Sequence, residues 1–463
     1  MARVATVAAP RARRRPLPGR WAAAQVLRAL RHDDRPFALV GAGWGGAVLG
    51  SEPVRVAGPG DDLFATLSTA PGPAPGPAPT VPTPTVSGHV GSEPGVRVGG
   101  AWVGYLGYQL NRRVERLPPA PGPAPALPDG ALAAYDHVLC QGPDGRWWFE
   151  SLATPGRERA VDDRYRLLAE RLSGAPPGPA PAACTPFRLA PDGDAHRAAV
   201  RAAVEYIRAG DIFQANVCLR AESHLDGDPL DLFCRGVEAL APAYAAYVRA
   251  PEGAVASFSP ELFLELRGRR ARTAPIKGTA RRAGDGDADA GRRALEASAK
   301  DRAENVMIVD LMRNDLGRVC AYGSVAVPRL AVAEPHPGLW HLVSEVVGDL
   351  REGAGPGDLV RAAFPPGSCT GAPKVRAMAI INELEATARG AYTGAVGLAG
   401  PVSGLTLNVA IRTVEWAAST GALILGVGGG IVADSDPDAE LAECVTKAGP
   451  IAAALGTHLV APT

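Results

Sequence analysis

Hydrophobic and polar positions alternate with a period of two along several short runs of the chain, which is the pattern of half-buried β-strands. In the second half of the chain we expect strands over 215–221, 254–258, 262–266, 323–328, 393–399, 406–412 and 422–433. In the first half the pattern predicts strands over 36–40, 101–106, 136–141 and 146–152. Strand-length segments therefore occupy both halves of the chain.

Between these runs, apolar positions recur at helical spacing. Helices are predicted over 193–209, 229–240, 287–318, 356–363, 373–388 and 437–454. We expect Asp194 to cap the first of them and Gly210 to end it. Grouped helices that interrupt runs of strands favour an α+β fold over a strict series of β-α-β units.

Three segments rich in Pro, Gly and Ala lie between these elements, at 71–84, 118–128 and 175–183. They hold too little bulky apolar surface to form a core, and they favour extended conformations. We interpret the first two as surface insertions within an N-terminal α+β region over 21–174. The third belongs to a linker over 175–188.

The two ends of the chain complete this plan. Residues 1–20 are basic and no apolar segment follows them, so we expect a disordered N-terminus and not a secretory signal. The dense strand and helix patterns after the linker predict a C-terminal domain over 189–460.

Charge and cysteine usage narrow the class of protein. The 463 residues include 48 Lys and Arg against 48 Asp and Glu, so the formal net charge is zero, whereas a binder of nucleic acid or anionic membranes needs a basic surplus. The longest apolar run, 422–433, is too short to span a bilayer. The seven cysteines lack paired spacing and are expected to be reduced. We therefore expect a cytoplasmic protein with neither nucleic acid nor membrane as a partner.

Lysine is rare among the cationic residues: only four occur, at Lys277, Lys300, Lys374 and Lys447, and the rest are arginines. A lysine can lose its proton and act as a nucleophile, which an arginine cannot do. Lys277 stands in the segment PIKGT, directly after a strand-like run. It is a candidate nucleophile, with an ordinary surface lysine as the alternative.

Three glycine-containing segments can be compared with known binding motifs. Gly41–Gly46 matches the GxGxxG pattern of dinucleotide-binding proteins, but the chain breaks at Gly50 where that fold needs a long helix. We interpret it as a turn between strands. The segment GSCTGAPK at 367–374 lacks the spacing of a phosphate-binding loop. Gly426–Gly430 is expected either to expose backbone N–H groups to an anion or to form a bulge.

Two pairs of carboxylates have helical spacing. Glu440 and Glu443 share one helix face, which Lys447 continues, and Asp301 and Glu304 share another. Oxygen ligands without histidine suit a hard divalent cation such as Mg²⁺. Solvated helix faces are the alternative, and spacing alone does not bring the two pairs together.

Eight segments of the chain together resemble the chorismate-utilising enzyme family, which includes anthranilate synthase component I. They are SPELFLEL, PIKGTARR, ENVMIVDLMRNDLGRV, HLVSEV, FPPGSCTGAPKVRAM, AYTGAVGLAG, LNVAIRT and GVGGGIVADSDPDAELAECVTKA. The resemblance is dense over about 190–455 and thinner over GGAWVGYLGYQL. It implies a layered α+β fold with two packed antiparallel β-sheets flanked by helices, and it makes 189–460 the chorismate-binding catalytic domain.

The resemblance also implies roles for single residues. Mg²⁺ would be bound by Glu304 and Glu443, with Glu440 and Asp301 in support, and would hold the ring carboxylate of chorismate. Tyr392 and Arg412 match positions that bind the enolpyruvyl carboxylate, for which a planar guanidinium is well suited. The other implied substrate contacts are Gln214, Thr279, His341, Thr370, Gly428, Gly429 and Lys447. His341 beside Trp340 has an ordinary core histidine as its alternative.

Two positions distinguish the reactions of this family. Gln214 stands where members that add water carry a lysine. Members that aminate carbon 2 usually read PIAGT, whereas this chain has Lys277 and reads PIKGT, as members that aminate carbon 4 do. The implied chemistry is attack of Lys277 on carbon 2, protonation of the leaving 4-hydroxyl by Glu261, and displacement of Lys277 by ammonia. The product would be 4-amino-4-deoxychorismate, a precursor of p-aminobenzoate.

No glutaminase segment is recognisable in the chain, so we expect a separate glutamine amidotransferase subunit to supply ammonia. The segment FALVGAG replaces the LLES that members inhibited by tryptophan carry. Three alternatives stay open. They are a synthase that aminates carbon 2 with an atypical Lys277, a non-catalytic subunit that only binds chorismate or the glutaminase, and a nicotinamide-dependent oxidoreductase resting on Gly41–Gly46 alone.

Overall fold

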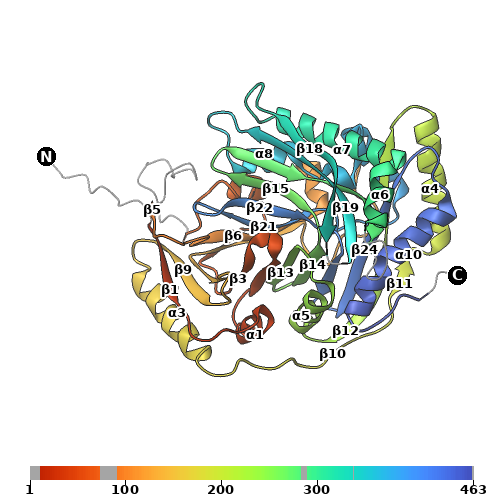
Figure 1. The fold of residues 1–463 in the computed structure, drawn as a ribbon. Coiled ribbons are helices and arrows are strands. Elements are labelled where there is room, and N and C mark those ends of the chain that lie inside the picture. The colour runs from red at the N-terminus through yellow and green to blue at the C-terminus, as the bar shows by residue number, and fades with distance from the viewer. Residues whose placement is uncertain (1–10, 73–90, 283–288, 337, 461–463) are drawn as a thin grey trace.

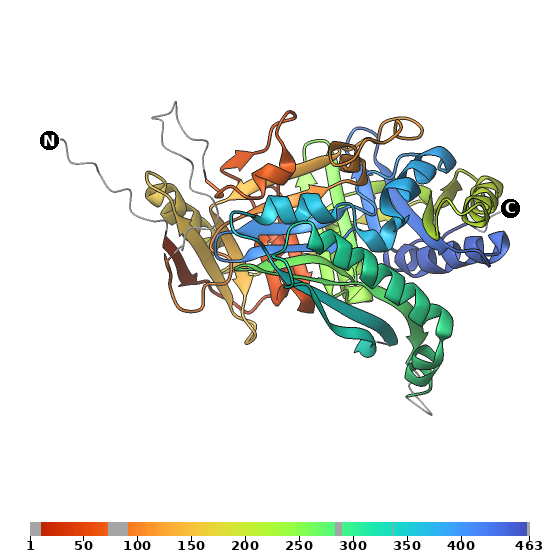
Figure 2. The ribbon, with the colours of Figure 1, turned by 90° about the horizontal axis from the view of Figure 1, so that it is seen from above.

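The computed structural model describes residues 11–72, 91–282, 289–336 and 338–460. Two β-sheets form the centre of the molecule, and helices lie on their outer sides (Figure 1, Figure 2). Within the described residues, the strand pairs are antiparallel except for β1 with β5. The expected α+β class with two packed antiparallel sheets is confirmed.

The first sheet has 14 strands from both halves of the chain. Its main path runs through β10 (Ala182–Cys184), β12 (Gln214–Gly227), β24 (Ala422–Ile431), β23 (Thr413–Ala417), β14 (Gly253–Ser259), β13 (Tyr244–Ala250), β2 (Phe37–Gly41), β3 (Gly46–Gly50), β8 (His137–Gln141), β9 (Trp147–Ala153), β1 (Arg11–Pro16) and β5 (Gly91–Ser92). Two further strands pair with β12, namely β11 (Arg188–Ala190) and β20 (Gly371–Ala372).

The second sheet has 10 strands, which also come from both halves of the chain. Its path runs through β17 (Ile276–Arg281), β19 (Leu339–Asp349), β16 (Arg270–Ala274), β15 (Leu262–Arg267), β22 (Gly404–Val409), β21 (Ala395–Gly400), β6 (Ala101–Leu106), β7 (Gly130–Tyr135) and β4 (Arg55–Val56). A further strand, β18 (Ala326–His336), pairs with β19. Because strands from below 174 and above 189 share both sheets, the N-terminal region and the C-terminal domain are joined through continuous hydrogen bonding.

Alternating side chains on each strand build separate cores on the two faces of a sheet. In β2, Phe37 and Leu39 pack between the sheets against residues such as Val103 of β6. Ala38, which points the other way, joins the core under the outer helices. The core between the sheets is therefore distinct from the two cores beneath the helices.

The helices divide between the outer sides of the two sheets. Those on the first sheet are α1 (Ala23–Ala29), α3 (Glu158–Arg171), α4 (Gly193–Arg208), α5 (Pro229–Leu240), α9 (Lys374–Leu384) and α10 (Pro437–Ala454). Those on the second sheet are α2 (Leu63–Thr66), α6 (Ala290–Ala297), α7 (Ala299–Gly317) and α8 (Pro356–Ala363). The short 3₁₀ segments are η1 (Ala42–Trp44), η2 (Tyr108–Arg113) and η3 (Gly367–Cys369). No helix among the described residues is long and apolar enough to cross a membrane.

The structure corrects several local expectations. The N-terminus is not disordered through residue 20, because Arg11–Pro16 pairs with β9 as strand β1. The strand is not evident from the sequence because the segment is mostly basic. In the fold, Ala12 is buried and the guanidinium of Arg14 stacks over the Trp148 ring at 3.7 Å. Part of the expected linker is also ordered as β10.

Two helix boundaries differ from the sequence prediction as well. Asp192, not Asp194, caps α4, since its carboxylate accepts the Ala195 N–H. The long helix predicted over 287–318 is two helices, because the Ser298 hydroxyl accepts the Asp301 N–H and starts a new helix there. Residues 287 and 288, like most of the insertion at 71–84, lie outside the described residues.

Candidate active site

The predicted site residues gather at the end of the molecule where α10 packs on β24, far from β1 and α3 (Figure 1). There β12 and β24 of the first sheet lie close to β17 and β19 of the second. Gly430 leaves room for the Gln214 side chain, because a Cβ placed on it would lie 2.2 Å from Gln214 Nε2. The same Cβ position is 3.8 Å from Lys277 Nζ of the second sheet, an ordinary contact distance. The two sheets thus bring Gln214 and Lys277 to one place.

Glu261 is a buried acid beside Lys277. It stands between β14 and β15, and its backbone N–H donates to the Ser259 hydroxyl at 3.2 Å. Burial raises the pKa of Glu261 to about 7, although a hydrogen bond from Ser368 and the charge of Lys277 lower it in part. A carboxyl group with this pKa is partly protonated near neutral pH and can donate a proton.

Lys277 projects from an irregular part of β17. The register of β17 against β19 shifts between Ile276 and Thr279, and Gly278 takes a left-handed conformation with φ of +81°. A Cβ at Gly278 would also press on the Asp301 carboxyl carbon at 3.1 Å. Such a bulge re-aims a side chain, and here it leaves Lys277 half-buried and near enough to Glu261 for its charge to lower the pKa of that carboxyl group.

His341 and Arg412 complete this part of the site. The Nδ1 of His341 lies 2.9 Å from the Thr279 hydroxyl across the β17–β19 pair. Burial, together with the neighbouring His336 and the charge of Arg412, lowers the pKa of His341 to about 4, so the ring is neutral near neutral pH. Burial lowers the pKa of Arg412 too, while Glu261 opposes that shift.

Tyr392 and Thr370 lie deeper, against the first sheet. Both are buried, and a Cβ on Gly426 would overlap the Tyr392 ring at 2.2 Å. The Thr370 hydroxyl donates to the Gly367 carbonyl at 3.1 Å, and its own carbonyl accepts the Asn216 N–H at 2.7 Å. Both residues are therefore fixed by the protein framework.

The two acidic residues of α10 have different environments. Ser435 donates to Glu440 at 2.7 Å, and burial together with the charge of Glu443 raises the pKa of Glu440. Burial would also raise the pKa of Glu443, but the charges of Lys447, Lys300 and Lys277 lower it overall. Glu443 is therefore the stronger anion of the two.

Lys447 and Lys300 connect this acidic helix to its surroundings. The Lys447 amine lies 2.7 Å from Glu443 and donates to the Gly428 carbonyl at 2.9 Å. A Cβ on Gly429 would be 2.8 Å from a carboxylate oxygen of Glu440, so α10 sits tightly on the glycine run. Lys300 is in the first turn of α7 and acts on both glutamates, which places the start of α7 near α10.

Glu304 and Asp301 lie on this first part of α7 and are half-buried. Within the described part of the chain, no group of three or more His, Cys, Asp or Glu side chains is arranged to hold a metal. Carboxylates from two helices, completed by water and substrate oxygens, fit the way Mg²⁺ is commonly bound. The protein alone does not form a closed metal cage here.

Some residues of the site were not found from the sequence. Ser368 and Gly278 act through close contacts that only the folded chain reveals, whereas Gly430 belongs to the glycine run already noted in the sequence. In contrast, Lys374 does not belong to the reactive group. It is buried in an ion pair with Asp315 at 2.5 Å and donates to two backbone carbonyls.

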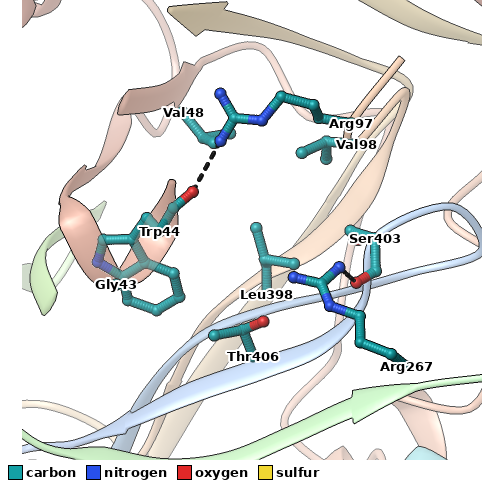
Figure 3. A pocket seen from close by; sticks show the side chains of 9 residues that line it. All are labelled: Gly43, Trp44, Val48, Arg97, Val98, Arg267, Leu398, Ser403 and Thr406. Atoms are coloured by element: carbon teal, nitrogen blue, oxygen red, sulfur yellow. Dashed lines mark hydrogen bonds between the residues drawn. The ribbon is translucent and has the colours of Figure 1, made fainter. Parts of the chain in front are cut away.

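The turn at Gly41–Gly46 is also resolved. It forms η1 and a left-handed Gly45 between β2 and β3, as interpreted from the sequence. This turn borders a cavity of about 250 Å³ between the sheets. Figure 3 shows the residues that line it, among them Arg97, which donates to the Trp44 carbonyl. The predicted site residues are not among those lining this cavity, which is therefore separate from the site at α10.

Comparison with known proteins defines the class. The chain belongs to the chorismate-binding enzyme family, which it matches over residues 77–453. It is 40% identical over 366 residues to aminodeoxychorismate synthase component 1 of Salmonella typhimurium, covering 78% of this chain and 77% of that protein. It is also 40% identical over 368 residues to anthranilate synthase component 1 of Streptomyces coelicolor, covering 75% and 71%.

A solved structure supports the same fold. Anthranilate synthase component I from Streptococcus pneumoniae superposes with a TM-score of 0.70 at 23% identity, over 89% of each chain. The sequence resemblance to the family is therefore confirmed. The equal identity to proteins of two different names means that the reaction has to be argued from the site.

Proposed function

We propose that this protein aminates chorismate at ring carbon 4, giving 4-amino-4-deoxychorismate. The observation that carries the proposal is Lys277, held half-buried on the bulged β17 beside Glu261 and Gln214. A buried, protonated carboxyl next to an amine supplies both a proton donor and a nucleophile. Its relatives named aminodeoxychorismate synthase component 1 support the same reaction.

The chemistry follows in two displacement steps. The Lys277 amine attacks carbon 2, the ring double bonds shift, and the 4-hydroxyl leaves as water with the proton of Glu261. Ammonia then adds to carbon 4, the double bonds shift back, and the bond to Lys277 breaks. The carboxylate of Glu261 recovers a proton as the added ammonia loses one, so the protein ends the cycle unchanged.

Other residues position the substrate in this proposal. Arg412 and Tyr392 bind the enolpyruvyl carboxylate. His341 is a neutral ring that can accept or donate a hydrogen bond, and its hydrogen bond with the Thr279 hydroxyl holds it in place. Thr370, Gly428, Gly429 and Lys447 line the remaining pocket. Gln214 replaces the water-activating lysine of other members, and its Oε1 has no partner among the described residues.

Glu304 and Glu443 would hold Mg²⁺, with Glu440 and Asp301 in support. The ion would neutralise the ring carboxylate of chorismate and help to orient it. The lowered pKa of Glu443 keeps this ligand ionised. Changing Glu443 to Gln should raise the Mg²⁺ concentration needed for half-maximal chorismate consumption at least tenfold. An unchanged Mg²⁺ requirement would remove Glu443 from the ligand set.

We further propose that ammonia comes from a separate glutamine amidotransferase. Relatives named as component 1 imply a second component, and this chain would then react with free ammonium on its own. Glutamine should replace ammonium only when that second protein is added. Glutamine-dependent product from the isolated chain would contradict the proposal.

Variants of Lys277 test the reaction most sharply. Lys277→Ala removes the nucleophile, and Lys277→Arg keeps the charge without a reactive amine. Both should lose amination at carbon 4, and Lys277→Ala should yield any residual product at carbon 2. Product identities are read by chromatography after a pyruvate-removing lyase is added. Retained carbon 4 amination in either variant would refute a nucleophilic lysine.

The alternative, amination at carbon 2, is favoured by one observation, which is the 40% identity to an anthranilate synthase component 1. In that case wild-type protein would give anthranilate, and the two variants would leave the product unchanged.

A further inference from the structure

Arg389 is a buried cation that the proposed reaction does not use. It follows α9, and its side chain is 2% exposed, like that of its ion-pair partner Glu385 at 3%. Nε and Nη2 donate to the two carboxylate oxygens of Glu385 at 2.9 and 2.6 Å. Its remaining N–H groups donate to the carbonyls of Cys369 and Asn216, at 2.9 and 2.6 Å, and to the Thr393 hydroxyl at 3.2 Å. All five guanidinium donors are satisfied by protein atoms.

Two of these acceptors belong to segments that carry substrate contacts. Cys369 directly precedes Thr370, and Asn216 follows Gln214 by two positions on β12. The Asn216 N–H also donates to the Thr370 carbonyl at 2.7 Å, which ties the two segments together. Arg389 therefore bridges β12 and the Gly367–Cys369 turn from behind.

The third acceptor fixes the turn that presents Tyr392. Thr393 has a left-handed backbone with φ of +60°, which is costly for a β-branched residue. Its hydroxyl receives the Arg389 N–H and donates to the Tyr392 carbonyl at 2.7 Å. The guanidinium thus holds the strained turn in place.

The structure also shows why Arg389 is not itself a substrate contact. The ring of Tyr108 covers the guanidinium at 4.4 Å, and the donors already have partners. We infer that Arg389, anchored by Glu385, is a positioning residue that sets the relative placement of Gln214, Thr370 and Tyr392. This inference rests on the proposed function, which assigns those three residues to chorismate.

Arginine is required for this role because its planar fork reaches three segments in fixed directions. A lysine offers three donors from one nitrogen and cannot span the same acceptors. Small displacements of these groups weaken their contacts with chorismate, and such misplacement can cost about a hundredfold in kcat/KM. Arg389→Lys should therefore raise the KM for chorismate at least tenfold.

A matched control separates this effect from a general loss of stability. Arg28 of α1 is a similarly buried arginine, 10% exposed and paired with Asp231 at 2.8 Å, but it lies under the first sheet away from the site. Arg28→Lys should lower the melting temperature without changing KM. Kinetics are followed as chorismate disappearance in the full-length protein, so the comparison does not depend on which product forms.

A KM and kcat within twofold of wild type in folded Arg389→Lys would overturn the inference, as would equal changes in Arg28→Lys. Where Arg389→Lys does not fold, Thr393→Val serves instead, because it removes one acceptor and keeps the Arg389–Glu385 pair. An unchanged KM in Thr393→Val would then overturn it. Product analysis of the wild type separately tests the proposed function.

Discussion

Two buried glutamates, Glu261 and Glu415, allow a comparison between the site and the framework behind it. Burial raises the pKa of both carboxyl groups to about 7. Glu261 accepts hydrogen bonds from the Ser368 side chain and the Ile276 backbone, and it lies near the charges of Lys277 and Arg412. Glu415, on β23, accepts the backbone N–H of Ala391 at 2.8 Å.

A raised pKa alone therefore does not identify a catalytic acid. Burial explains both shifts, and the neighbours decide what each carboxyl group can do. Glu415 holds the turn at Gly390, where an added Cβ would lie 2.5 Å from its Oε1. Glu261 instead faces the amine of Lys277, where a proton can be passed to a leaving group.

Replacing each glutamate by glutamine should change kcat very differently, and this is the largest effect we expect. Glu261→Gln keeps the shape but cannot donate a proton, so kcat should fall by about 10²- to 10⁴-fold. Glu415→Gln should leave kcat within about threefold, because its oxygen can still accept the Ala391 N–H. Initial rates of chorismate consumption check both. Equal losses in the two variants would remove the distinction.

The pH dependence of the wild type should follow Glu261. Only the protonated acid is active, whereas Lys277 must react as a free amine. The ratio of the wild-type kcat/KM to that of Glu261→Gln, in which the requirement for a free amine is shared, should therefore fall about tenfold per pH unit above about pH 7. The measurement uses a fixed concentration of free NH₃ at each pH, because the supply of ammonia itself rises with pH. A ratio that stays constant or increases above neutral pH would contradict Glu261 as the acid.

Glu415 should instead appear in the stability. Its pKa is raised in the folded state, so the folded protein binds the proton more tightly and loses stability as pH rises from about 4.5 to about 7. The loss for a shift of this size is about 3 kcal/mol. Thermal unfolding of Glu415→Gln should therefore depend less on pH than that of wild type. Parallel curves for the two proteins would show that Glu415 does not contribute.

The smallest effect concerns the hydrogen bond to Glu261. Ser368 lowers the pKa of Glu261 in part, so Ser368→Ala should raise it further. The ratio of its kcat/KM to that of Glu261→Gln should then begin to fall at a higher pH than the wild-type ratio does, by less than about one unit. A fall that begins at a lower pH would mean that Ser368 stabilises the protonated acid.

Strong periodic patterns made much of the fold predictable. Helices such as α5 and α10 begin and end where the sequence indicates, because a Pro at the first position and an Asp cap mark their starts. Strand β1 could not be predicted from apolar alternation because its segment is mostly arginine, and the guanidinium of Arg14 lies over the Trp148 ring. The break at Ser298 was missed because both flanking segments are helical.

The site was predictable in its parts but not in its connections. Motif residues such as Lys277 and Glu261 could be named, and the structure places them together. The Arg389–Glu385 pair has ordinary helical spacing in the sequence, and only the fold shows that it is buried behind the site. Lys374 shows that scarcity of lysine does not separate a structural ion pair from a reactive amine.

Identification of the product tests most directly whether the protein aminates chorismate at carbon 4. The purified full-length chain is incubated with chorismate, Mg²⁺ and ¹⁵N-labelled ammonium, and a pyruvate-removing lyase is then added. Labelled p-aminobenzoate is expected, because its formation requires amination at carbon 4. Labelled anthranilate, or unlabelled salicylate, would contradict it.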